Sequence, residues 1–443
     1  MRGFPIDRDQ RRALVASALL VVGAAACEER TPTSVDERLL PPEPVTMEVR
    51  LGWDEFASNL EVFGGYGAPE ELGTGVVANE YADTLNARTL VRFGAYPTET
   101  SVRDSAGTIR TDTNLTFVGG RLVAFLDTLA STNTSPVTLA AGATQNEWHS
   151  RTVTWTAAVD TIGDTRPWPE PGAGAVTPIG TSDWDPNASD SVWFSIDSAT
   201  IAEWADTTDA SRGVRLDLLT AGHRVQVNSV ALRLITRPSL NPDTLVDVTA
   251  PRRNLTFVYD PFPEPPPDGI RIGGVPAWRT VLDIGLPARL TGPPELCAAV
   301  GCPLTLESGQ VNHAALLLRS RQTEAAFQPT DTVRLDVRPV FSRAAMPKSP
   351  LGSSLIGQSQ NGHVAPAAFG SGAGVQIEVP VTQFVRQLLP GASQGPVDPP
   401  STLALLSVFE PLSISFATFH GPGGPDEPVL KLIITVSPSL ELP

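Results

Sequence analysis

Beyond residue 47 the apolar residues fall in short runs, and clusters of Gly, Pro, Asn and Asp separate one run from the next. Residues 88–93 read RTLVRF and residues 214–219 read VRLDLL, and in the second run apolar and polar positions alternate from Val214 to Leu218. A period of two residues places one face of a strand against a core and the other in water. This pattern predicts an all-β fold of jelly-roll-like antiparallel β-sandwiches with short helices.

The strand pattern occurs twice in the same order, which indicates an internal repeat. Residues 88–93 correspond to 279–284, and residues 192–204 correspond to 375–389, where a strand runs directly into a short helix. The segment RPSLNPD at 237–243 separates the two copies. The remaining matched pairs are 122–129 with 313–320, 135–139 with 331–335, 214–219 with 403–408, and 230–236 with 429–436. We therefore expect two tandem sandwich domains, 48–240 and 241–443.

The N-terminus has the features of an export signal. Residues 1–12 contain four Arg, and an apolar run of 14 residues at 13–26 leads to Cys27. The run is shorter than the roughly 20 residues that a membrane-spanning helix needs. It resembles a bacterial lipoprotein signal, which implies that Cys27 is lipidated and becomes the first residue of the mature chain. An ordinary cleaved signal, or a short anchor with an incidental cysteine, is the alternative.

Residues 27–47 are rich in Pro and charge, and they predict an extended tether between a lipid anchor and the folded part. With residues 1–26 as the signal peptide, the folded part is expected in the cell envelope, outside the cytoplasm, at the outer membrane or the cell surface. Acyl chains at Cys27 would hold it to the membrane through buried methylene groups.

The net charge limits the classes of partner that the chain is expected to bind. The chain carries 32 Lys+Arg against 48 Asp+Glu, a formal net charge of −16. A field of this sign repels phosphate backbones, so nucleic acid is not an expected partner. With 42 Pro and 37 Gly, long helices are also disfavoured.

Two further cysteines, Cys297 and Cys302, lie close together in ELCAAVGCPL. In an oxidising compartment such a pair predicts a local disulfide. A metal site is the alternative, but it would need more ligands than this segment offers.

Several segments of the first copy resemble a known family. NEWHSRTVTW at 146–155, WPEPG at 168–172, a strand with a short helix that ends at Trp204, and GVRL at 213–216 occur in the order found in DNRLRE-type domains, also called carbohydrate-binding module family 96. The second copy, from 243 to 437, fits less closely and lacks the Trp-rich segment. The resemblance implies a jelly-roll sandwich in secreted and surface proteins, some of which bind acidic polysaccharides such as alginate.

The candidate ligand contacts are tryptophans. Trp168 and Trp184 lie in Pro-, Gly- and Asp-rich segments and are predicted to be exposed. Trp155, Trp193 and Trp204 lie in apolar strand or helix patterns and are predicted to pack in a core.

A Ca²⁺ site is a second candidate. Asp183, Asp185, Asn187 and Asp190 bring hard oxygen ligands together, although ordinary turn formation also explains such a cluster. Otherwise no cofactor is expected.

No catalytic motif stands out. The five His show neither metal-ligand spacing nor an adjacent nucleophile motif: His149, His223, His313, His363 and His420. The sequence thus favours a non-catalytic, lipid-anchored envelope protein with tandem modules that bind extracellular polysaccharide. A structural or adhesive surface protein with protein partners is the first alternative. A polysaccharide-degrading enzyme is the second, because paired carboxylates meet only in the fold.

Overall fold

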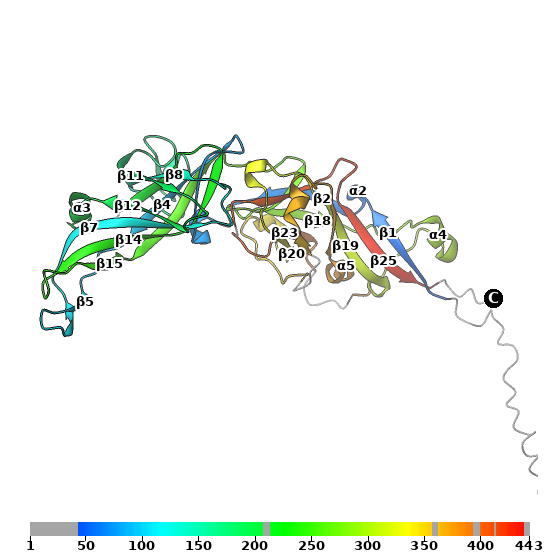
Figure 1. Cartoon of the computed structure of the whole chain (residues 1–443). Helices are drawn as coiled ribbons and strands as arrows, with labels where there is room; N and C mark the ends of the chain where they lie inside the picture. The colour runs from blue at the N-terminus through cyan, green and yellow to red at the C-terminus, as the bar shows by residue number, and fades with distance from the viewer. Residues whose placement is uncertain (1–42, 207–212, 357–361, 393–398, 412, 438–443) are drawn as a thin grey trace, which may run out of the picture.

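The computed structural model describes residues 43–206, 213–356, 362–392, 399–411 and 413–437. These residues form two β-sandwiches that lie end to end (Figure 1), and every named strand pair is antiparallel. The all-β prediction is therefore confirmed. None of the helices within these ranges is long and apolar enough to cross a bilayer.

The first sandwich has two halves. One half has the strand order β11-β8-β13-β4-β16, and the other has the order β12-β7-β14-β15. Strand β3 pairs with both β4 and β14 and so joins the halves into one strongly curved sheet. The bounds are β3 Gly75–Tyr81, β4 Leu85–Phe93, β7 Leu115–Asp127, β8 Val137–Thr144, β11 Val176–Trp184, β12 Ser191–Ile196, β13 Gly213–Leu218, β14 His223–Pro238, β15 Val246–Ala250 and β16 Arg252–Asp260. The hairpins β5 Thr100–Arg103 with β6 Ile109–Asp112, and β9 Ala157–Thr161 with β10 Asp164–Pro167, extend from it, and α3 Ser198–Asp206 follows β12.

The second sandwich repeats this arrangement. Its sheets have the orders β21-β20-β23-β18-β2 and β22-β19-β25-β1, and β17 pairs with β24 beside them. The bounds are β1 Val45–Leu51, β2 Ala57–Phe63, β17 Gly269–Gly273, β18 Arg279–Ile284, β19 Val311–Arg319, β20 Val333–Val340, β21 His363–Val364, β22 Gln376–Pro380, β23 Thr402–Ser407, β24 Phe416–His420 and β25 Val429–Val436. Its helices are α2 Trp53–Phe56, α4 Pro294–Val300 and α5 Thr382–Leu388. Short 3₁₀ turns span Pro69–Leu72, Ser308–Gln310, Ala325–Phe327, Arg343–Ala345 and Pro366–Phe369.

The alternating pattern of the sequence explains the two cores. In β14 the alternate residues from Val230 to Leu234 are buried, while the intervening residues are half-exposed. The inward residues of both halves of the first sandwich form one hydrophobic cluster, which includes Leu122, Leu139 and Phe194. A separate cluster fills the second sandwich. Burial of these apolar side chains, at about 25 cal/mol per Å², supplies most of the driving force for folding.

The predicted repeat is confirmed by strand order. Six strands of the first sandwich have a counterpart at the same sheet position in the second: β4 with β18, β7 with β19, β8 with β20, β12 with β22, β13 with β23 and β14 with β25. In both copies a strand runs into a short helix, from β12 into α3 and from β22 into α5.

The edge strands depart from the predicted boundaries of 48–240 and 241–443. Strands β1 and β2 precede the first sandwich in sequence, yet they pair with β25 and β18 of the second. Strands β15 and β16 follow residue 240, yet they pair with β14 and β4 of the first. The two copies have thus exchanged their leading strand pairs, and the first sandwich is inserted into the second. The hydrophobic pattern marks these segments as strands but does not show which core they join.

This exchange places both ends of the described chain together. Val45 pairs with Val436, so β1 begins and β25 ends at the same end of the second sandwich. In Figure 1 that end of β1 and β25 lies opposite the end of the first sandwich that carries β5 and α3.

A third hydrophobic cluster joins the two sandwiches. It contains Phe257 and Tyr259 from β16 of the first sandwich, and Trp278, Phe327 and Phe416 from the second. The rings of Phe327 and Phe416 stack with their centroids 5.3 Å apart, and Tyr259 meets Phe327 edge to face at 6.3 Å. Aromatic packing of this kind adds to the energy of area burial and couples the two bodies.

Candidate functional site

The Trp-rich segment folds back over one sheet of the first sandwich. Trp148 and Trp168 pack with Leu90 and Val258 in a small cluster on the outer side of β4 and β16, and Trp155 lies against it. The segment that carries the family resemblance is therefore a cap over the sheet. In the second sandwich a smaller cluster around Val281 and Leu406 lies at the corresponding strands.

Arginines from β4 lie between the cap and the sheet. The guanidinium of Arg92 lies 4.4 Å from the ring centroid of Trp148, and that of Arg88 lies 5.0 Å from the ring of Trp155. Arg88 also pairs with Asp217 at 3.1 Å and donates a hydrogen bond to the carbonyl of Gly172. Burial lowers the pKa of Arg88, and the carboxylate of Asp217 opposes that shift. The cation–π contacts and the hydrogen bond to Gly172 fix the cap on the sheet, and the ion pair with Asp217 holds Arg88 to the neighbouring strand β13.

Neither of the two predicted ligand tryptophans is exposed. Trp168 is 5 % exposed and its indole donates to the carbonyl of Thr154, while Trp184 is 1 % exposed and its indole donates to the carbonyl of Ser189. Both are packing residues, so the prediction that they are exposed is wrong. Trp155 is half-buried, Trp204 is buried as predicted, and Trp193, predicted to pack in a core, is exposed.

The predicted calcium cluster forms a turn. Asp185 accepts hydrogen bonds from the backbone and side-chain amides of Asn187, and Asp183 accepts one from the hydroxyl of Thr138 at 2.6 Å. The backbone carbonyl of Asp190 accepts a hydrogen bond from the amide of Leu126. Within the described ranges no group of three acidic, His or Cys side chains is arranged to hold a metal ion. The oxygens of Asp183 and Asp185 thus serve turn and strand contacts.

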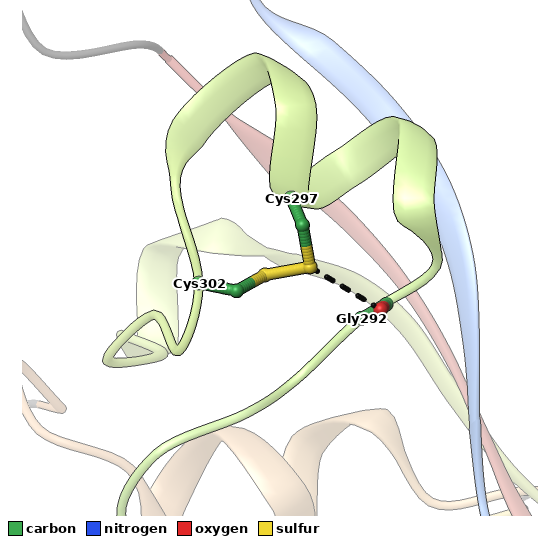
Figure 2. The surroundings of a disulfide bond; sticks show 3 residues. All are labelled: Gly292, Cys297 and Cys302. Carbon is green, nitrogen blue, oxygen red and sulfur yellow. Dashed lines mark hydrogen bonds between the residues drawn. A yellow bond between two sulfur atoms is a disulfide. The ribbon is translucent and has the colours of Figure 1, made fainter.

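The predicted disulfide is present. Cys297, in α4, is bonded to Cys302 just past the end of the helix, and its sulfur lies 3.4 Å from the carbonyl oxygen of Gly292 (Figure 2). The bond closes one local loop of the second sandwich. The predicted lipidation site, Cys27, lies outside the described residues.

A cleft of about 480 Å³ opens where the two sandwiches meet. Its walls come from the cap at 151–156, from the end of β16 with the loop after it at 257–262, and from the linkers at 65–69 and 275–276. Neither sandwich alone supplies all of these walls. The size is within the range of small-ligand sites, roughly 300–1,000 Å³.

Aromatic side chains provide the apolar surface of this cleft. Trp155 is half-buried and Phe262 is 56 % exposed within it, whereas Tyr259 lines it with only 7 % of its surface exposed. The rings of Tyr259 and Phe262 are stacked with their centroids 6.0 Å apart. Burial raises the pKa of Tyr259 well above its ordinary value, so its hydroxyl stays neutral.

Polar groups lie among these rings. Arg151 contacts Glu71 at 3.4 Å and Glu70 at 3.8 Å, on the 3₁₀ turn beside the cleft, and its side chain is 65 % exposed. Thr152 also lines the cleft, with its hydroxyl bonded to the amide of Asp160 and to His149, and Asp260 is the one carboxylate among the described residues that line the cleft. An aromatic surface with a few hydroxyl, guanidinium and carboxylate groups suits a polyhydroxylated ligand with apolar faces.

The sequence analysis did not identify two of these aromatic residues. Tyr259 ends a strand, and Phe262 follows it in the Pro-rich stretch DPFPEPPP. An aromatic residue in a proline-rich turn is a signal of exposure, but the cleft also needs the contact between the two sandwiches. That contact leaves no local pattern in the sequence.

Among the described residues, two histidines have polar side-chain partners: the ring of His149 lies 3.1 Å from the hydroxyl of Thr152, and His313 lies beside a carboxylate. His313 lies 2.7 Å from Glu378, which also accepts a hydrogen bond from Lys431 at 2.6 Å. Burial alone would raise the pKa of Glu378, but the interactions with Lys431 and His313 outweigh it and lower that pKa. This cluster lies on the outer face of the sheet made by β19, β22 and β25.

Comparison with known proteins adds little to this geometry. No protein-family model and no curated protein matches the chain. Weak matches to solved structures include the C-terminal domain of the antigen I/II-family protein AspA of Streptococcus pyogenes, with 6 % identity, 80 % of this chain and 91 % of that chain covered, and a TM-score of 0.14. The cowpea mosaic virus top component matches with 12 % identity, 82 % and 92 % coverage, and a TM-score of 0.11. Scores this low carry no structural argument.

Proposed function

We propose that the chain is a non-catalytic, lipid-anchored envelope protein that binds extracellular polysaccharide in the cleft between its two sandwiches. The observation that carries this proposal is the cleft itself, with the rings of Trp155 and Phe262 beside polar groups. Aromatic faces pack against the C–H-rich faces of sugar rings, and the polar groups bond to hydroxyls.

The position of the chain ends supports an anchored role. Because Val45 and Val436 lie together, a tether that enters at residue 43 would hold the second sandwich near the membrane. The first sandwich would then project outward, with the cleft between the two bodies (Figure 1). The resemblance of residues 146–216 to carbohydrate-binding module family 96 agrees with a sugar ligand.

A binding role fits the cleft better than hydrolysis does. Glycoside hydrolysis ordinarily uses two carboxyl groups on either side of the scissile bond, about 5 to 9.5 Å apart. Asp260 is the one carboxylate among the described lining residues. Glu70 and Glu71 beside the cleft are paired with Arg151, which supports a binding role for this surface.

The proposal is tested by affinity electrophoresis and a glycan array with residues 43–443, against neutral and acidic polysaccharides. We expect retention by at least one polymer, and about tenfold weaker retention for Phe262→Ala because a stacking surface is removed. The matched control is Phe341→Ala, since Phe341 is 62 % exposed and lies outside the cleft. Absence of retention would favour a structural surface protein with protein partners.

The lipid anchor has a separate test. With Cys27→Ser we expect the protein to leave the membrane fraction, because the acyl chains that supply membrane affinity are no longer attached. Unchanged membrane retention would contradict the lipoprotein assignment.

A further inference from the structure

The outer face of the β12-β7-β14-β15 sheet carries an exposed tryptophan. Trp193, in β12, is 60 % exposed, whereas its neighbours Val192 and Phe194 point into the core and are 3 % exposed. The alternation of β12 therefore directs Trp193 outward. This surface is separate from the cleft, because no residue of β12 lines it.

Strand register defines the surroundings of the tryptophan on this face. Trp193 lies opposite Val123 of β7, which lies opposite Ala231 of β14. Two residues along the strands in one direction, the cross-strand neighbours are Ser191, Phe125 and Ser229. In the other direction they are Ser195, Arg121, Arg233 and Thr249. Trp193 is the largest side chain among these residues, and most of its neighbours are short or carry hydroxyls. The register thus describes an open aromatic platform with hydroxyl groups around it.

Two guanidinium groups lie beside the platform. Arg121 and Arg233 are direct cross-strand partners, and Arg121 also bonds to Asp247 of β15 at 2.7 Å. One carboxylate thus accompanies two positive charges, on a chain whose net charge is −16. The face offers hydrogen-bond donors with local positive charge, which complements oxygen-rich ligands.

The apolar area is small for a protein interface. A Trp side chain provides at most about 250 Å², so the exposed part of Trp193 is on the order of 150 Å². Val123 and Phe125 beside it are half-buried. A specific protein interface covers roughly 800 Å² on each partner. A single sugar ring, in contrast, needs only one aromatic face and nearby hydrogen-bond donors.

We propose that this sheet face is a second polysaccharide-binding site, in which one pyranose ring stacks on Trp193 and Arg233 donates hydrogen bonds to the oxygens of the sugar. The proposal rests on the proposed function for the choice of ligand, but it uses a surface that the cleft does not share.

The test is affinity electrophoresis of residues 43–443 in gels that contain a neutral or an acidic polysaccharide, run separately. Trp193→Ala is expected to weaken retention about tenfold on the polymer that is bound, and Trp193→Phe, which keeps an aromatic face, less than about threefold. Phe341→Ala is the control for loss of an exposed aromatic elsewhere, and thermal melting checks that each variant is folded.

The outcomes separate this proposal from the cleft. Weaker retention in Trp193→Ala, with Phe262→Ala unaffected, supports the sheet-face site and contradicts the cleft. Weaker retention in both variants supports both sites. Unchanged retention in Trp193→Ala overturns the sheet-face site whatever Phe262→Ala does, and absence of binding by the parent chain overturns both. A parent chain that elutes as a dimer, and a Trp193→Ala variant that elutes as a monomer, would identify the face as a contact between copies and overturn the proposal.

Discussion

Individual tryptophans in the first sandwich have different structural roles. Trp184 is almost fully enclosed and donates a hydrogen bond to the carbonyl of Ser189, whereas Trp193 is largely exposed on the sheet face. Replacing an enclosed aromatic side chain leaves a cavity as well as losing apolar burial.

We therefore expect Trp184→Ala to lower the free energy of unfolding by roughly 3 to 5 kcal/mol. Trp193→Ala should change it by less than about 1 kcal/mol, because little buried contact is lost. Urea denaturation followed by circular dichroism measures both values. Equal destabilisation by the two variants would contradict the assigned burial.

Asp112 makes the stability of the fold depend on pH. Its side chain is 2 % exposed and accepts hydrogen bonds from the amide of Leu240 at 2.7 Å, the amide of Asn114 at 2.8 Å and the hydroxyl of Ser239 at 3.0 Å. The amide of Leu240 lowers the pKa of Asp112 the most, and burial opposes this shift without cancelling it.

A folded-state pKa below the unfolded-state pKa stabilises the protein above the unfolded value, and that stabilisation is lost as the pH falls through the folded value. Asp112→Asn should thus be less stable than the parent at about pH 7, and the difference should shrink toward about pH 3. Thermal melting at both pH values measures it. A difference that grows toward acid would contradict the direction of the shift.

At this scale the sequence predicted the disulfide and the burial of Trp204, but not the burial of Trp168 and Trp184 or the exposure of Trp193. The alternation in VWFSI, with Val192, Phe194 and Ile196 buried, already indicated that Trp193 points away from the core. The prediction that Trp193 is buried followed its apolar character and not this two-residue alternation. Trp168, by contrast, lies in a loop that folds back on the sheet, and no local pattern shows that contact.

The exchanged strand pairs are the main feature at the level of elements. Strands β1 and β2 occupy in the second sandwich the positions that β15 and β16 occupy in the first. In a simple tandem array each pair would join the copy that follows it in sequence. Here each pair joins the other copy, so the first sandwich is continuous from residue 75 to residue 260. The second sandwich depends on β1 and β2, which are distant in sequence from its other strands.

This arrangement predicts where a core substitution in an edge strand takes effect. Leu51 in β1 is 2 % exposed, and Leu51→Ala should speed amide hydrogen exchange in β25 and β19 without changing β14 or β7. Hydrogen exchange resolved by mass spectrometry measures this effect.

Val248→Ala in β15 provides the reciprocal control. Val248 is 8 % exposed, and its replacement should speed exchange in β14 and leave β25 unchanged. Faster exchange in the first sandwich after Leu51→Ala would contradict the exchanged pairing.

The order of the strands was predictable because each copy repeats the same sequence of apolar runs. The partners of the edge strands were not. A strand from β1 or β15 offers the same alternating face to either core, and the choice depends on the linkers and on contacts distant in sequence.

At the scale of the whole molecule, the aromatic cluster between the sandwiches determines whether they act as one body. Phe327 is 3 % exposed and contacts Phe416 of its own sandwich and Tyr259 of the other. The same contact region holds the two walls of the cleft together.

Phe327→Ala should lower stability by roughly 3 to 5 kcal/mol and separate the unfolding of the two sandwiches, because the cavity lies at their contact. Differential scanning calorimetry is expected to show two transitions in place of one. A single transition at the parent temperature would contradict a coupling role. Phe341→Ala serves as the control for loss of an exposed ring.

The cleft also shows which features of the whole molecule can be predicted from the sequence. The all-β class and the duplication follow from local patterns, whereas the cleft combines residues 65–69, 151–156, 257–262 and 275–276. Only the contact between the two bodies brings these segments together, so no single segment carries the signal of a binding site.

The most direct test of the central claim is hydrogen exchange of residues 43–443 with and without a polysaccharide that the protein retains. The account predicts slower exchange in segments 151–156 and 257–262, which wall the cleft, and no change in the segment around the disulfide at 294–304. Retained polysaccharide without slower exchange in the two cleft segments would contradict the claim that the junction of the sandwiches is the binding site.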